Sequence, residues 1–119
     1  MPLRWPLHCT VDAQDGVPIV VASGRVSYRT AATLAAVLHQ AVGDAKVLSG
    51  LVLDLQQVDY VSSAGLRAIE AALVRLADAK LILVAPPEPV RIAFDLAGLS
   101  TRVAIAPSRP EALARIAER

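Results

Sequence analysis

Short apolar runs mark five predicted strands along the chain. They lie at residues 7–12, 17–22, 51–55, 81–84 and 103–105. Asp15 and Gly16 separate the first two runs and predict a hairpin turn, and Gly24 is expected to end the second strand. The runs at 51–55 and 81–84 are almost purely aliphatic, which is typical of parallel strands that are buried on both faces.

Apolar residues at helical spacing predict about four helices between and after these strands. Thr30 and Ser108 are suited to cap the first and the last helix at their N-termini. Gly43 and Gly98 follow two of the helical patterns, where a left-handed C-terminal cap is expected. The element order is therefore β-β-α-β-α-β-α-β-α, which predicts an α/β fold with a mixed, mostly parallel sheet of four to five strands.

The composition indicates a single domain that covers residues 1–119. Hydrophobic residues make up 55% of the chain and aromatic residues only 3%, so the core is expected to be aliphatic. The formal net charge of +1 gives no electrostatic attraction to nucleic acid. The sequence contains no apolar span long enough to predict membrane insertion. It also contains no basic block that would bind an anionic membrane surface. We therefore expect a cytoplasmic protein that is monomeric on its own.

The sequence lacks the usual signatures of catalysis and cofactor binding. His8, His39 and Cys9 do not have metal-ligand spacing, and a single cysteine cannot form an internal disulfide. There is no phosphate-binding loop of the G-x-x-x-x-G-K-[ST] type. The glycines that flank a nucleophilic serine in G-x-S-x-G are missing around Ser63. We therefore expect no metal, no cofactor and no enzymatic activity.

The most informative segment runs from Asp59 to Leu66, with the sequence DYVSSAGL. An expected loop at 58–61 leads into a helix that starts at Ser62 and Ser63. Serine is a favoured N-cap, so one of the two hydroxyls can be explained by capping alone. The second hydroxyl is not needed for that purpose.

Small residues follow the two serines, since Ala64 and Gly65 occupy the first helical turn. Glycine inside a helix costs roughly 0.5–1 kcal/mol relative to alanine, so its presence indicates a close approach of another group. A phosphate on a hydroxyl at this position would meet unpaired amides and the positive end of the helix dipole. It would also add about −1.5 to −2 charges and so could prevent a partner from docking.

Three stretches together resemble the bacterial anti-sigma factor antagonists of the STAS domain family. They are residues 24–31, residues 53–66 and residues 94–99, in the family's order and spacing. The resemblance extends from about residue 7 to residue 116, and it implies a single STAS domain. It also implies that Ser63, two residues before Gly65, is the phospho-acceptor, with Asp59, Tyr60, Ser62, Ala64, Gly65 and Leu66 forming the supporting loop and helix start.

The resemblance further implies regulation by partner switching. In that scheme the antagonist with an unmodified serine binds an anti-sigma factor that is also a serine kinase, and phosphorylation releases it. A PP2C-like phosphatase then restores the serine. The alternative is a scaffold of the same fold that is not switched, such as a small subunit of a lipid-transport ABC complex or of a signalling assembly.

Two positions depart from the family's usual pattern. Ser62 stands where an aspartate often precedes the acceptor, so Ser62 is also a competing acceptor. Ser27 stands where an aspartate is common in the loop before the first helix. We expect Ser27, Arg25, Arg29 and Arg67 to be available for partner contacts, with the two earlier arginines in that same loop.

Asp54 interrupts the apolar run at 51–55 and has two possible roles. A buried carboxylate must be hydrogen-bonded to be tolerated. Asp54 could accept hydrogen bonds from loop amides near the end of its strand. It could instead shape a pocket beneath Ser63.

Overall fold

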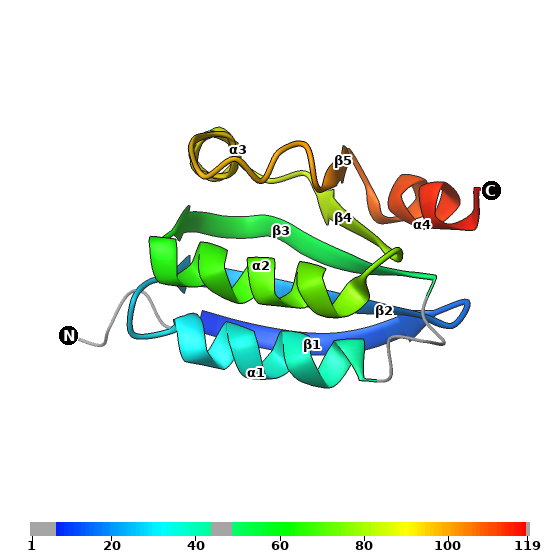
Figure 1. Cartoon of the computed structure of the whole chain (residues 1–119), viewed down its shortest axis with the longest axis horizontal. Helices are drawn as coiled ribbons and strands as arrows, with labels where there is room; N and C mark the ends of the chain where they lie inside the picture. Colours follow the sequence, from blue (N-terminus) through cyan, green and yellow to red (C-terminus); the bar gives the residue numbers. More distant parts are fainter. Residues whose placement is uncertain (1–6, 44–48, 119) are drawn as a thin grey trace.

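A five-stranded sheet organises the chain, and its strands lie side by side in the order in which they occur in the sequence (Figure 1). The computed structural model describes residues 7–43 and 49–118. The strands are β1 Leu7–Gln14, β2 Val17–Val26, β3 Gly50–Val61, β4 Lys80–Val84 and β5 Ala104–Ala106. The helices are α1 Ala31–Val42, α2 Ser63–Leu76, α3 Glu88–Leu96 and α4 Arg109–Ala117. The predicted order of elements and the predicted α/β class are confirmed.

The sheet is mixed, as predicted, with one antiparallel pair at its edge. β1 pairs with β2 in antiparallel orientation, and all the other neighbouring strands are parallel. Asp15 and Gly16 both have positive φ angles, of 54° and 79°, as a two-residue hairpin turn requires. β3 lies in the middle of the sheet, which explains why residues 51–55 are all buried.

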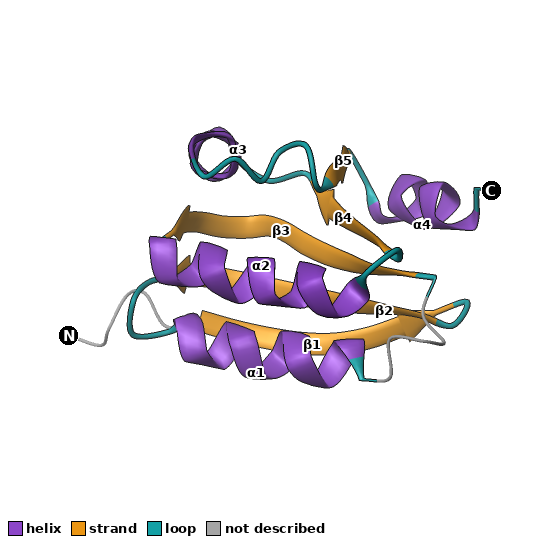
Figure 2. Cartoon of the chain, in the orientation of Figure 1, coloured by secondary structure: helices purple, strands orange, loops and turns teal. Residues whose placement is uncertain are grey.

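The helices cover the two faces of the sheet unequally (Figure 2). Because side chains alternate along a strand, Leu51, Leu53 and Leu55 point to one face and Val52 and Asp54 to the other. The leucines share a core with apolar residues of α1, α2 and α3. Val52 belongs to a smaller core on the opposite face, which is completed by residues of α4. Within the described ranges, no helix is both long enough and apolar enough to cross a bilayer.

β2 and β3 extend well beyond the strands that the sequence patterns predicted. Gly24 does not end β2, and residues 58–61 are not a loop, because the β2–β3 pairing continues to Val26 and Val61. The pairing tolerates this extension because it contains register shifts beside Gly24, whose φ of 114° is accessible to glycine. Arg25 therefore lies in β2 and not in the loop before α1, where it was expected.

The predicted helix ends are correct in position, with one difference in mechanism. Gly43 has a positive φ at the C-cap of α1, and Ser108 caps α4 by accepting a hydrogen bond from the amide of Glu111. Thr30 occupies the N-cap position of α1, but its side chain caps no helical amide. Its hydroxyl instead donates to the Arg25 carbonyl and accepts from the Ser27 amide, because the preceding turn brings both groups within reach.

Candidate functional site

The candidate site lies where β2 and β3 end together and α2 begins. The Ser62 amide donates a hydrogen bond of 2.7 Å to the carbonyl of Val26, the last residue of β2. This bond holds the start of α2 beside the turn that leads from β2 to α1. The carboxyl ends of two parallel strands thus meet at the first turn of a helix, which is a common place for functional groups in open α/β sheets.

The two serines at this junction have different environments. Ser62 is only 9% exposed, and its hydroxyl oxygen accepts a hydrogen bond of 3.1 Å from the Gly65 amide, so Ser62 is the N-cap. Ser63 is the first residue of the helix, and it is exposed. Capping therefore accounts for Ser62, while the hydroxyl of Ser63 is left for another role.

Gly65 is explained by packing within the protein. It is buried, and a Cβ at this position would lie 2.5 Å from Cγ1 of Val26 and 3.0 Å from Cγ1 of Val61. The absence of a side chain lets the first turn of α2 rest directly on the ends of β2 and β3. The close approach that Gly65 was expected to indicate is therefore made by side chains of the sheet.

A shallow hollow of about 180 Å³ opens between the start of α2 and the end of α3. Ser63, Leu66 and Arg67 line it from α2, together with the other lining residues Glu70, Ala97 and Leu99. Leu96 of α3 is 83% exposed, which is unusual for a leucine. The exposed Ser63 thus lies on a surface with both apolar and charged groups.

Arg25 and Tyr60 lie beside the junction but on the other face of the sheet. They are paired across β2 and β3, and the Arg25 guanidinium carbon is 4.3 Å from the centroid of the Tyr60 ring. Val26 and Val61, their neighbours in the sequence, point to the face that α2 covers. The cation–π contact therefore extends the surface around the edge of the sheet and does not lie beneath Ser63.

The remaining predicted contact residues differ in how they are held. Ser27 and Thr30 form a hydrogen-bonded turn, in which the Ser27 amide donates to the Thr30 hydroxyl oxygen at 2.8 Å. Because Ser27 directly follows Val26, this turn lies next to the start of α2. Arg29 and Asp59 are exposed, and neither has a side-chain hydrogen bond or ion pair among the described residues.

Asp54 is part of a structural contact that the sequence analysis missed. Its carboxylate accepts a hydrogen bond of 2.8 Å from Nε of Arg109, the first residue of α4, and further bonds from Gln56. Asp54 lies in the middle of β3 on the α4 side, so it neither ends a strand nor shapes a pocket beneath Ser63. Arg109 is 55 residues away in sequence, and only the strand order brings it to Asp54.

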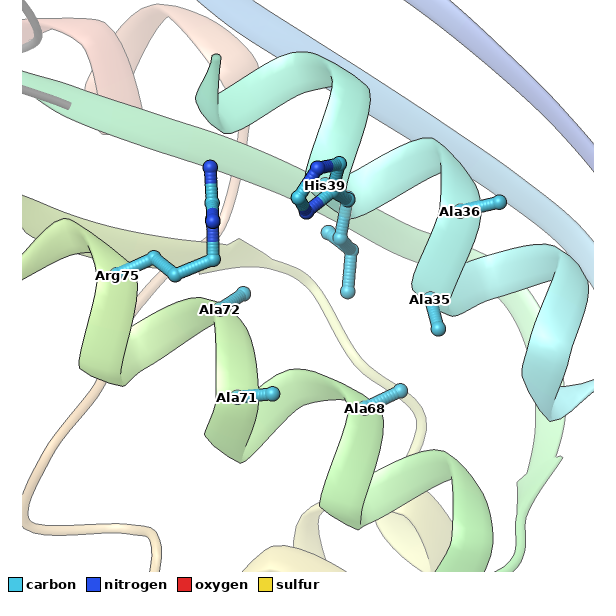
Figure 3. A pocket seen from close by; sticks show the side chains of 8 residues that line it. Ala35, Ala36, His39, Ala68, Ala71, Ala72 and Arg75 are labelled. Atoms are coloured by element: carbon cyan, nitrogen blue, oxygen red, sulfur yellow. The ribbon is translucent and has the colours of Figure 1, made fainter. Parts of the chain in front are cut away.

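A second hollow, of about 330 Å³, lies between α1 and α2 (Figure 3). Alanines line most of it, and His39 and Arg75 lie at one end. Arg75 donates a hydrogen bond of 3.1 Å to the Gly43 carbonyl, which satisfies the C-terminal end of α1. Small side chains leave this hollow open between the two helices, and His39 and Arg75 are its ionisable lining residues.

No group of His, Cys, Asp and Glu residues within the described part of the chain is arranged to hold a metal ion. Cys9 is half-buried in β1, and burial raises the pKa of its thiol. A raised pKa disfavours the reactive thiolate. Neither feature adds chemistry to the junction around Ser63.

The fold and the site together define the class of protein. The STAS domain family model matches residues 8–112, nearly the whole chain. The chain belongs to the STAS domain family.

Several similar proteins are named as anti-sigma factor antagonists. A Bordetella bronchiseptica protein assigned by name as an anti-sigma factor antagonist, BtrV, is 36% identical over 91% of this chain and 93% of its own length. The crystal structure of an anti-sigma factor antagonist from Mycobacterium paratuberculosis has a TM-score of 0.87 at 26% identity, over 99% of this chain and 100% of that one. The phosphorylated form of SpoIIAA from Bacillus has a TM-score of 0.70 at 15% identity, over 92% of this chain and 99% of that one, which shows a shared fold.

Proposed function

We propose that this protein is an anti-sigma factor antagonist that is switched by phosphorylation of Ser63. With Ser63 unmodified, it binds an anti-sigma factor that is also a serine kinase, and the sigma factor is thereby released. Phosphorylation ends this binding, and a PP2C-like phosphatase restores it. The similarity to proteins named as anti-sigma factor antagonists supports the general role. The switch itself is argued from the residues around Ser63.

The observation that carries the proposal is that the two serines have different structural roles. Ser62 is buried and uses its hydroxyl to cap the Gly65 amide. Ser63 is exposed at the first position of the same helix. A kinase can reach Ser63 without opening the helix, whereas reaching Ser62 would require the cap to break.

The chemistry at Ser63 is a simple phosphoryl transfer. The Ser63 oxygen would form a bond to the γ-phosphorus of ATP as the bond from that phosphorus to ADP breaks. The hydroxyl proton would pass to a base of the kinase. All catalytic groups belong to the kinase, and this chain supplies the accepting oxygen and its surroundings.

The charge at the start of α2 makes the surface sensitive to such a change. The first turn contains no acidic residue, so it presents the positive end of the helix dipole without a counter-charge. A phosphate would bring about −1.5 to −2 charges onto this turn, beside the apolar Leu66. A partner that docks over the turn would then meet a hydrated dianion, which opposes burial of the surface.

The proposal can be tested with two forms of the purified chain, one unmodified and one with phosphoserine incorporated at position 63 during translation. Each form is immobilised and exposed to an extract of the source bacterium. We expect the unmodified form to capture a protein with an ATP-dependent serine kinase domain and the phosphorylated form to capture at least tenfold less. Added ATP should place a single phosphate on Ser63, as mapped by mass spectrometry, and none on a Ser63→Ala variant.

Two outcomes would contradict the proposal. Equal phosphorylation of the Ser63→Ala variant would show that another residue is the acceptor. Capture of the same partner by both forms, for instance a transporter ATPase, would instead identify an unswitched scaffold.

A further inference from the structure

Arg67 lies one helical turn after Ser63 and lines the same hollow. Residues four positions apart are neighbours on one face of a helix, with Cβ atoms roughly 5–6 Å apart. Arg67 is exposed, and the structure gives its side chain no hydrogen bond or ion pair with any described residue. A flexible cation without a counter-ion is therefore within reach of the Ser63 oxygen.

The other charged side chain that lines this hollow already has a partner. Glu70 forms an exposed ion pair of 3.6 Å with Arg102, which approaches from the segment between α3 and β5. Arg75, at the far end of α2, donates to the Gly43 carbonyl. Of the three arginines Arg67, Arg75 and Arg102, only Arg67 has no hydrogen bond or ion pair within the described residues, and it lies beside the acceptor.

We propose that Arg67 is the internal partner of a phosphate on Ser63. This inference rests on the proposed function in one respect, that Ser63 is the phosphorylated residue. The guanidinium group forms charge-assisted hydrogen bonds with the phosphate oxygens and directs the phosphate along α2, over Leu66. The order of the two groups is the favourable one, because the anion lies at the N-terminus of α2 and precedes the cation by four residues.

The ion pair has two consequences for the switch. It lowers the second pKa of the phosphate, which is about 6 for a phosphoserine, so the dianion persists to a lower pH. It also engages phosphate oxygens that a phosphatase must bind. Arg67 thereby keeps the phosphate in its dianionic form over a wider pH range and slows its removal, compared with a helix start that lacks this arginine.

The test uses the full chain with phosphoserine incorporated at position 63, so it requires no kinase or partner. The second pKa of the phosphate is measured by ³¹P NMR titration in this protein and in its Arg67→Gln variant. We expect the pKa to be about 0.3–0.7 units lower with Arg67 present, as an exposed ion pair of this kind would produce. The difference should shrink at high salt, which screens exposed charges.

Arg75→Gln is the matched control, because it removes the same charge from the same helix. Arg75 lies 12 residues after Ser63, or about 18 Å along the helix axis. Its replacement should change the phosphate pKa by no more than about 0.1 units, since screening is strong at that distance. Equal shifts in the two variants, or no shift in Arg67→Gln, would overturn the proposal.

The result is separable from that of the proposed function. If the phosphate pKa depends on Arg67 but no kinase modifies Ser63, then the ion pair is real and the proposed switch is wrong. If a kinase modifies Ser63 but the pKa is the same without Arg67, then the switch stands and Arg67 has no part in it.

Discussion

The first turns of α2 and α4 are built on the same plan and differ in what is added to it. Each helix begins with a buried or half-buried serine whose hydroxyl caps an amide three residues later. The Gly65 amide nitrogen lies 3.1 Å from the Ser62 hydroxyl oxygen, and the Glu111 amide nitrogen lies 3.3 Å from the Ser108 hydroxyl oxygen. Both turns lie against the sheet, one on each face.

The α4 turn has further structural anchors. Arg109 is tied to the buried Asp54, Pro110 fixes the first turn, and Glu111 provides a negative charge near the N-terminus. The α2 turn has none of these. It contains an exposed serine and two small residues, and no acidic residue.

This comparison separates what a helix start needs for stability from what α2 has in addition. Every polar group in the α4 turn can be assigned to capping, charge balance or anchoring. In the α2 turn, Ser62 and Gly65 are explained in the same way. Ser63 is not explained by capping or packing. Its exposure at a helix N-terminus that lacks an acidic residue is the feature that favours a regulatory role.

The largest effect is expected from removing the anchor of α4. Arg109→Ala would leave Asp54 buried in β3 without its cationic partner, and we expect a loss of about 2–3 kcal/mol in unfolding free energy. Urea denaturation measures this loss. The control is Arg102→Ala, which breaks an exposed ion pair and should cost less than about 0.5 kcal/mol. Equal losses in both variants would show that the Asp54 contact contributes no more than a surface pair.

The next effect concerns the packing that anchors α2. In Gly65→Ala the new methyl group would overlap Val26, and we expect a net loss of about 1–2 kcal/mol despite the higher helix propensity of alanine. Val26→Ala removes the obstructing methyl groups. The double variant should therefore lose less stability than the sum of the two single variants, as a double-mutant cycle measures. Strict additivity would mean that Gly65 and Val26 are not in steric contact.

Much of the fold could be predicted from periodicity. The aliphatic runs at 51–55 and 81–84 predicted central parallel strands, and Asp15-Gly16 predicted the hairpin. The length of β2 and β3 could not be predicted. Gly24 resembles a strand breaker in isolation, and only the cross-strand pairing of Arg25 with Tyr60 and of Val26 with Val61 shows that the strands continue past it.

The site could be predicted in part, for a different physical reason. The DYVSSAGL segment located the strand-to-helix junction, but the sequence could not decide which serine is buried. That depends on Val26, whose carbonyl and side chain fix the first turn of α2 from a distant part of the chain. The partner of Asp54 could not be predicted either, because a carboxylate in a strand does not indicate which later helix will provide its hydrogen-bond donor.

A smaller effect should separate the two serines. Ser62→Ala removes the cap of the Gly65 amide, so we expect a loss of about 1 kcal/mol in unfolding free energy. Ser63→Ala removes an exposed hydroxyl and should change stability by less than about 0.5 kcal/mol. Chemical denaturation of the two variants measures both values. A loss at Ser63 as large as that at Ser62 would indicate that Ser63 also has a structural role.

The smallest effect tests why the α2 turn lacks the acidic residue that the α4 turn contains. Ala64→Glu would place a carboxylate in the first turn of α2, where the helix dipole should stabilise the protein by about 0.3–0.5 kcal/mol at low salt. Ala64→Gln is the uncharged control, and the difference between the two variants should disappear at high salt. If Ala64→Glu stabilises the fold but weakens partner binding, then stability does not explain why this turn lacks an acidic residue. The explanation is then that the docking surface must remain free of negative charge until Ser63 is phosphorylated. If Glu is no better than Gln at low salt, the amides of this turn are not free to interact with an anion.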